Sequence, residues 1–246
     1  MPVPNYLSKS QYVLGKQCPK ALWYSHHRKE LKLPPDAEKQ ALFETGREVG
    51  DLARQLFPGG QLVDCKPWEI EKSVQETQRL ISEGAFVIYE AAVLSPDGVY
   101  ARADILRKSG ESWDLIEVKS STSVKDYHID DAAVQYHAFI AAGYAIGKCY
   151  VMHINNGYVR QGAIDIANLF TQADVTDRVI TQQEGISAQV EALRKLATEP
   201  NEPQVVIGAH CDDPFECDFR HHCWKDVPKY SVFNALKADK AFEIAK

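Results

Sequence analysis

The spacing of apolar residues along the chain changes from a helical period of about 3.6 residues to the period of two that strands show. The helical spacing predicts helices over residues 7–32, 37–56 and 67–83. One apolar stripe of the second helix is expected to face a core and consists of Leu42, Phe43, Val49 and Leu52. Proline and glycine residues separate the three helical segments.

The period of two follows over residues 86–94, 99–107 and 113–120. Short turns that contain glycine connect these three segments, and turns of this length predict an antiparallel meander. The rest of the pattern predicts a helix over 124–142, a strand over 147–154 and a long helix over 182–198. Strands that lie between helices in this order predict an α/β fold, with a sheet flanked by helices.

The chain has 246 residues, of which 45% are apolar and 25% are charged, and these values are ordinary for a globular domain. They exclude a disordered tail, a collagen-like chain and a small disulfide scaffold. No apolar run approaches the ~18 residues of a membrane span, and no apolar signal sequence opens the chain. We therefore expect one domain over residues 1–246 that is cytoplasmic and has no membrane partner.

The formal net charge is −6, yet residues 1–34 are basic. Against Glu30 alone, this segment carries Lys9, Lys16, Lys20, Arg28, Lys29 and Lys32. A basic arm on an acidic body can contact a phosphate backbone, and aromatic rings such as Tyr12, Trp23 and Tyr24 can stack on bases. The alternatives are a solvated helix face for the charges and core packing for the rings.

Two acidic residues, Asp104 and Glu117, lie on the second and third strands of the expected meander. In a hairpin they meet side by side, where two carboxylates repel each other and lose solvation. A divalent cation, Mg²⁺ or Mn²⁺, resolves both problems because it prefers oxygen ligands, and the Val118 carbonyl is a further candidate donor. Lys119 would then lie close enough to orient or activate a water nucleophile.

Two further residues belong to this candidate site. Glu90, on the preceding strand, is a third carboxylate and a further candidate ligand, with an edge residue facing water as the alternative. Gln135, on the next helix, can hydrogen-bond the lysine, a water on the metal or a phosphate, although an ordinary polar helix position explains it equally. A lone Glu-x-Lys usually forms a surface ion pair, so the prediction depends on the whole set.

Three of the six cysteines lie within thirteen residues, with the spacing Cys211-x5-Cys217-x5-Cys223. In a cytoplasmic chain, clustered cysteines indicate a metal site more often than disulfides. Cys65 and Cys149 are expected to be ordinary buried or half-buried thiols.

Three pieces of the chain together form a known arrangement: Asp104, Glu117-Val118-Lys119 and Gln135-x3-Phe139. This arrangement resembles the core motif of the PD-(D/E)XK nucleases, and within them the RecB-like iron–sulfur nucleases. The chain is similar to the CRISPR-associated RecB-like exonucleases, to AddB-type nuclease domains and to uncharacterised bacterial proteins with a RecB-like N-terminal domain. The resemblance implies a restriction-endonuclease-like core at about residues 85–160, with a central mixed sheet.

The same resemblance assigns the cysteines. It implies that Cys18 joins Cys211, Cys217 and Cys223 around a structural [4Fe–4S] cluster. Such a cluster would connect an N-terminal segment, about residues 7–33, to a C-terminal segment, about residues 205–230. Zinc is the main competitor, since four cysteines also suit Zn²⁺, but the five-residue gaps favour the cluster.

The function implied is that of a metal-dependent DNA nuclease, an exonuclease that prefers single strands. Asp104, Glu117 and Val118 would hold Mg²⁺ or Mn²⁺, and Lys119 and Gln135 would complete the catalytic set. Gly50 stands where many of these nucleases carry a histidine ligand, so a DNA-binding or scaffold module with weak or no catalysis is the alternative. A cluster-based redox sensor is a third hypothesis, and the resemblance leaves room for protein partners in a repair or defence complex.

Overall fold

The computed structural model describes residues 6–235 and contains a seven-stranded mixed sheet. The strands are β1 (Leu7–Ser8), β2 (Gln61–Leu62), β3 (Val87–Leu94), β4 (Val99–Ser109), β5 (Ser112–Lys119), β6 (Ile146–Ile154) and β7 (Phe170–Asp174). Strands β3, β4 and β5 form the expected antiparallel meander, and β6 pairs with β5 in parallel. Strands β2 and β7 pair with β3 and β6, and the short β1 pairs with β4 in parallel.

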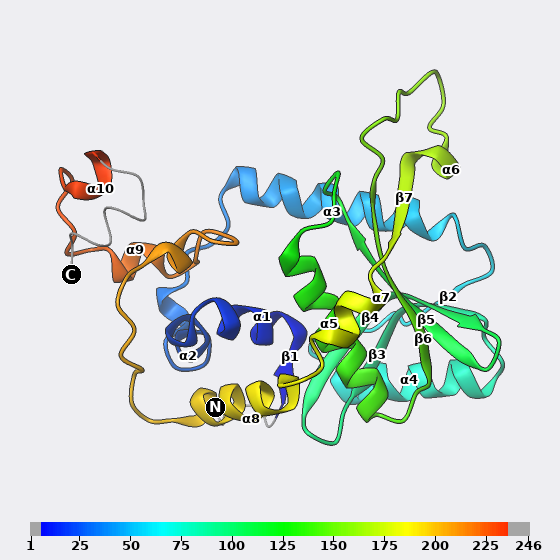
Figure 1. Cartoon of the computed structure of the whole chain (residues 1–246), viewed down its shortest axis with the longest axis horizontal. Coiled ribbons are helices and arrows are strands. Elements are labelled where there is room, and N and C mark those ends of the chain that lie inside the picture. Colours follow the sequence, from blue (N-terminus) through cyan, green and yellow to red (C-terminus); the bar gives the residue numbers. More distant parts are fainter. Residues whose placement is uncertain (1–5, 236–246) are drawn as a thin grey trace.

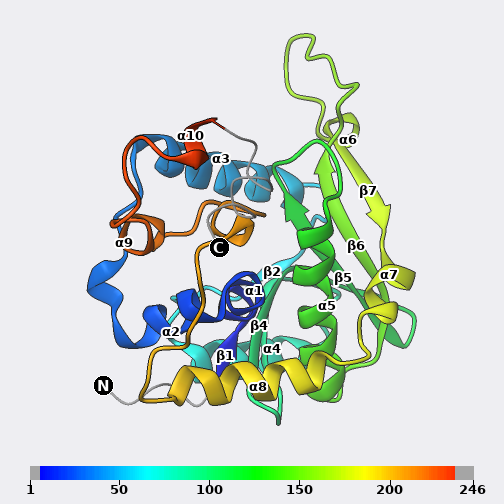
Figure 2. The same cartoon turned by 60° about the vertical axis from the view of Figure 1, so that its left-hand side comes forward.

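Helices cover both faces of this sheet (Figure 1). The helices are α1 (Lys9–Gln17), α2 (Pro19–His27), α3 (Ala37–Arg54), α4 (Ile70–Ser82), α5 (Asp126–Ala141), α6 (Ile166–Leu169), α7 (Thr176–Thr181), α8 (Ile186–Thr198), α9 (Arg220–Cys223) and α10 (Val232–Ala235). The largest core lies between the sheet and α5, α8 and α1, and a second core lies under the end of α3. Figure 2 shows α8 running beside α1 and α2. The α/β prediction, with a mixed sheet flanked by helices, is confirmed.

The prediction of one helix over residues 7–32 is wrong. Proline at position 19 has no N–H and restricts the residue before it to extended backbone, and Cys18 accordingly has φ −153° and ψ 110°. Helix α1 therefore ends at Gln17 and α2 begins with Pro19. The consequence is that Cys18 lies at a corner between two helices. A separate difference is β7, a strand at the edge of the sheet that the sequence pattern did not reveal.

The prediction that α3 turns Leu42 and Phe43 toward a core is also wrong. Their side chains are 63% and 50% exposed, whereas Val49 and Ala53 near the end of the helix are buried. Only the C-terminal third of α3 packs on the sheet, against residues that include Ile105 and Ile116. An apolar stripe thus continues beyond the core that it was expected to fill.

For the aromatic rings of the N-terminal basic segment, the structure agrees with core packing, the alternative to contact with nucleic acid. Its aromatic residues Tyr12, Trp23 and Tyr24 are buried, so they pack in the core and do not stack on bases. Five of its six cations form ion pairs, which are Lys9–Glu117, Lys16–Asp130, Lys20–Glu202, Arg28–Glu30 and Lys32–Asp218. Among the described helices, none has the length and apolar character needed to cross a membrane.

Candidate active site

The candidate site lies where β4 and β5 part. Along one edge of β4, β5 pairs with residues 105–109 and β1 pairs with residues 99–100, so Asp104 lies between the two partners. Its carboxylate oxygen Oδ2 accepts a hydrogen bond from the Val118 backbone N–H at 2.7 Å. In an extended strand the N–H and C=O of a residue point to the same side, so the Val118 carbonyl also faces Asp104.

Strand β3, which pairs with the other edge of β4, is irregular at the position opposite Asp104. Glu90 on β3 has a left-handed backbone, with φ +57°, and the β3–β4 pairing skips it while continuing on both sides. The alternation of faces along β4 also changes phase here, because Ala103 and Leu106 both face the main core. A non-glycine residue in this conformation costs about 1–3 kcal/mol, and such strain concentrates at functional sites.

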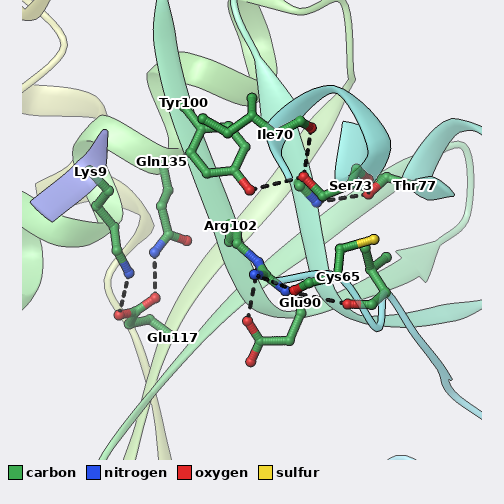
Figure 3. A network of polar contacts seen from close by, with 12 residues as sticks. Lys9, Cys65, Ile70, Ser73, Thr77, Glu90, Tyr100, Arg102, Glu117 and Gln135 are labelled. Carbon is green, nitrogen blue, oxygen red and sulfur yellow. Dashed lines mark hydrogen bonds and ion pairs between the residues drawn. The ribbon is translucent and has the colours of Figure 1, made fainter. Parts of the chain in front are cut away.

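Glu117 is the centre of a buried polar network (Figure 3). Its Oε1 accepts hydrogen bonds from Lys9 Nζ and Lys119 Nζ, both at 2.8 Å, and its Oε2 accepts one from the Gln135 amide. Lys119 also donates to Asp131 on α5. The sequence predicted a lysine, water or phosphate partner for Gln135, and the structure gives it the carboxylate itself.

Lys9 and Asp131 are members of this network that sequence reasoning missed. Lys9 follows β1 directly, and the pairing of Leu7 and Ser8 with β4 brings it to the gap beside Asp104. Its partner Glu117 is 108 positions away in the chain, so no local pattern links them. Asp131 lies one helical turn before Gln135 on α5, and this i, i+4 spacing was the signal that could have revealed it.

The electrostatics of the network set the charge of each group. Burial, and then the nearby charge of Glu117, raises the pKa of Asp104 to about 7. Burial opposes ionisation of Glu117, but the ammonium groups of Lys119 and Lys9 outweigh it and hold the pKa of Glu117 below its usual range. Burial likewise opposes the charge of Lys119, yet Glu117 and Asp131 raise its pKa. Lys119 therefore stays protonated and can act as a charged hydrogen-bond donor.

Buried His128, beside this network on α5, should make stability depend on pH. Burial and the charge of Lys119 lower its pKa to about 4, and its Nδ1 accepts from the Lys125 N–H at 3.1 Å. Between an unfolded pKa of about 6.5 and pH 4, the unfolded chain binds more protons, so stability falls as the pH falls. We expect the wild type to lose about 2 kcal/mol more than His128→Asn between pH 7 and pH 5 in urea unfolding. Equal losses would contradict this.

Glu90 is held by two arginines. Arg54 on α3 and Arg102 on β4 approach its carboxylate at 2.8 Å and 3.4 Å, and Arg102 also donates to the carbonyls of Cys65 and Val63 (Figure 3). Glu90 is thus part of a paired cluster and not an edge residue that simply faces water. Its role as a metal ligand stays a prediction.

A cavity of about 660 Å³ opens between α3 and the sheet, next to the candidate site. Residues of the sheet that line it are Glu90, Asp104, Ile105 and Val118. Gly50 lines it too, and an added Cβ at this position would meet no heavy atom within 4 Å. Gly50 therefore lies on the cavity wall, with space for a side chain.

Carboxylate and carbonyl oxygens fit a magnesium or manganese ion in this place. Mg²⁺ is usually bound through one or two carboxylates and keeps several waters. Asp104 and Glu117 supply two carboxylates: Asp104 Oδ2 and Glu117 Oε2 each accept one hydrogen bond and keep a second lone pair, whereas Glu117 Oε1 already accepts two hydrogen bonds. Within residues 6–235, no group of three or more His, Cys, Asp and Glu side chains could hold one metal ion.

The cysteines that the sequence grouped lie together in the structure. One small cavity is lined by Cys18, Cys211, Cys217 and Cys223. Burial raises the pKa of the Cys18, Cys217 and Cys223 thiols, and nearby Cys211 contributes to each shift. Bound iron or zinc favours the thiolate form of cysteine. Four cysteines that line one cavity are a donor set of the kind that holds a [4Fe–4S] cluster.

Cys65 and Cys149 lie apart from this group, as expected. Cys149 is fully buried on β6, and Cys65 is half-buried before α4. Burial raises the pKa of Cys149 to about 12, which keeps that thiol neutral.

Comparison with solved structures finds partial likeness. The chain is similar to LHK-Exo in complex with dAMP, with a TM-score of 0.43, 15% identity and coverage of 78% of this chain and 89% of that one. It is similar to SSO0001, with a TM-score of 0.38, 14% identity and 78% coverage of both chains. A phage-related exonuclease from Haemophilus somnus 129PT gives a TM-score of 0.29, 11% identity and coverage of 73% and 92%. No family model and no curated protein matches the chain.

Proposed function

We propose that the protein is a metal-dependent DNA nuclease with the expected restriction-endonuclease-like core, an exonuclease that prefers single strands. The observation that carries the proposal is the meeting of Asp104, Glu117 and Lys119 beside an open cavity. A buried carboxylate pair with an adjacent fixed ammonium is an arrangement that suits phosphodiester hydrolysis.

Each residue of the site has a defined task in this proposal. Asp104 and Glu117, with the Val118 carbonyl, hold Mg²⁺ or Mn²⁺, which when bound neutralises phosphate charge and makes a water molecule more acidic. Lys119 orients or activates the attacking water and offsets phosphate charge. Gln135 fixes the orientation of Glu117 through its buried amide.

The four grouped cysteines hold a structural [4Fe–4S] cluster in the same proposal. They come from the corner between α1 and α2 and from the segment around α9, which are distant in the chain. A cross-link between such distant segments restricts the unfolded chain and fixes the ends of the fold against each other. Zinc at the same thiols is the alternative that iron and zinc analysis distinguishes.

The test uses protein purified without oxygen and end-labelled single- and double-stranded DNA, with Mg²⁺ or Mn²⁺. We expect metal-dependent degradation that starts from an end and is faster on single strands, and that Asp104→Asn abolishes. Intact DNA in both samples, from protein that retains its iron, contradicts the nuclease proposal.

A DNA-binding module with weak or no catalysis is the second candidate, and Gly50 favours it. The cavity wall has no imidazole at this position, and Glu117 already accepts three hydrogen bonds. A site with fewer ligands binds its ion less tightly, which would leave DNA binding intact while cleavage is slow. DNA binding without metal-dependent cleavage would identify this candidate.

The effect of Gly50 can be measured directly. We expect Gly50→His to bind Mn²⁺ about tenfold more tightly than the wild type, because an imidazole adds a ligand to the two carboxylates. Gly46→His is the matched control, since Gly46 lines the same cavity one turn before Gly50 on α3 and also has open space at Cβ. Mn²⁺ titration followed by electron paramagnetic resonance measures both. Equal affinities in the two variants would contradict a ligand position at Gly50.

A further inference from the structure

The face of α3 that borders the cavity exposes apolar side chains. Leu42 and Phe43 are 63% and 50% exposed, and every residue from 40 to 48 is exposed. A helix of a globular domain normally turns such residues toward a core. Exposed apolar groups that gather at a cavity indicate a binding surface, whereas single exposed residues are ordinary.

This face forms one continuous wall. The cavity-lining residues of α3 recur every three or four positions and are Leu42, Phe43, Gly46, Arg47, Gly50, Asp51 and Arg54. The opposite side of the same cavity contains Asp104 and Val118. A ligand that contacts the α3 wall therefore continues directly to the candidate active site.

The wall is held at both ends. Near its start, Lys39 pairs with Asp218, the residue that follows Cys217 in the cysteine-bearing segment. Near its end, Val49 and Ala53 pack on the sheet. Figure 1 shows α3 crossing between these two regions. The exposed middle of the helix is thus a preformed surface that needs no further ordering before it binds.

The chemistry of the wall changes along its length. Leu42 and Phe43 are apolar, and the two glycines that follow leave open space. Arg47 makes no ion pair with any other described residue, whereas Arg54 pairs with Asp51 and Glu90. The ring of Phe43 can stack on a base. The guanidinium of Arg47, one turn closer to the carboxylates, can contact the phosphate that follows that base.

We propose that the α3 wall binds unpaired nucleotides next to the active site, with Phe43 stacking on a base and Arg47 contacting a phosphate. The inference rests on the proposed nuclease function and supplies its preference for single strands. In a duplex only the outer faces of the two terminal base pairs are uncovered, so away from the ends an exposed ring can stack only on an unpaired base. Stacking and phosphate contacts are common to DNA and RNA, so the wall itself accepts either.

The test measures binding without added divalent cation, so that no strand is cleaved. Fluorescein-labelled oligodeoxythymidylate, oligouridylate and a blunt DNA duplex are titrated with wild type, Phe43→Ala and Phe86→Ala, and anisotropy is followed. Phe86 is the control because it is 77% exposed and does not line the cavity. We expect Phe43→Ala to weaken binding of single strands about tenfold and to leave duplex binding unchanged, and Phe86→Ala to change neither. Arg47→Gln should release about one counterion fewer on binding single strands, which is measured from the slope of the logarithm of the binding constant against the logarithm of the salt concentration.

Several results would overturn the inference. The first is that Phe43→Ala and Phe86→Ala bind single strands equally well. The second is that Phe43→Ala weakens duplex binding as much as it weakens binding of single strands. The third is that Phe43→Ala changes the oligomeric state without changing nucleotide binding. The last would show that a second copy covers α3. Equal weakening of both labelled single strands supports the inference, since the contacts use base faces and phosphates. If the wild type binds single strands through Phe43 but cleaves none with Mg²⁺ or Mn²⁺, the inference stands and the proposed nuclease function fails.

Discussion

Asp104→Asn should lower metal-dependent cleavage of single-stranded DNA by about 10³-fold or more. The amide oxygen of asparagine can still accept the Val118 N–H bond, so the break between β4 and β5 keeps its structure. What is lost is one of the two negative charges that attract the divalent cation. The measurement is the rate of loss of full-length end-labelled DNA on denaturing gels, together with Mn²⁺ affinity.

Asp114→Asn is the matched control for this variant. Asp114 is as buried as Glu117 but pairs with Arg107 at 2.6 Å, away from the cavity. We expect this variant to cleave DNA at a rate close to that of the wild type. Cleavage by Asp104→Asn at the rate of Asp114→Asn would show that the activity comes from another site or from a contaminant.

Cys211→Ser should remove the cluster and destabilise the fold by about 3–5 kcal/mol, the effect of losing a cross-link over a long loop. The expected signs are loss of iron and sulfide, loss of visible absorbance and a lower urea midpoint. Binding of single strands should weaken as well. Asp218 lies beside Cys217 and pairs with Lys32 and Lys39, so a loosened cysteine segment no longer holds the start of α3.

Cys65→Ser is the control for the cluster, since Cys65 is half-buried and lies outside the cysteine cavity. It should keep its iron and its stability. If wild-type protein purified without oxygen contains zinc and no iron, the four cysteines form a zinc site and not an iron–sulfur cluster. Unchanged iron content in Cys211→Ser would remove Cys211 from the ligand set.

Local patterns predicted most of the fold because they depend on near neighbours in the chain. The period of two along β3, β4 and β5, with short turns between them, specified the meander. The same reasoning failed at α3, where apolar spacing predicted burial of Leu42 and Phe43. Periodicity reports which residues share a face, but not whether another element reaches that face.

The residues of the candidate site likewise fall into those that local patterns predicted and those that they could not predict. Asp104 and Glu117 were predictable as neighbours because one hairpin register brings them together. Lys9 was not, since its contact with Glu117 depends on the pairing of β1 with β4. The pairing of Glu90 with Arg54 and Arg102 also depends on contacts between distant elements.

Residues close together in the chain were enough to predict the meander of β3, β4 and β5, the strand β6, the helices α3, α4, α5 and α8, the carboxylate pair, the Glu-x-Lys spacing and the grouping of three cysteines. The packing of distant segments alone shows that Lys9 pairs with Glu117 and that α3 walls the cavity beside Asp104. It also brings Cys18, which the resemblance had grouped with the other three cysteines, into the same cavity as them. The physical reason is that such contacts form only when distant segments pack on a common core. Their free energy depends on that packing, and no local pattern of residues encodes it.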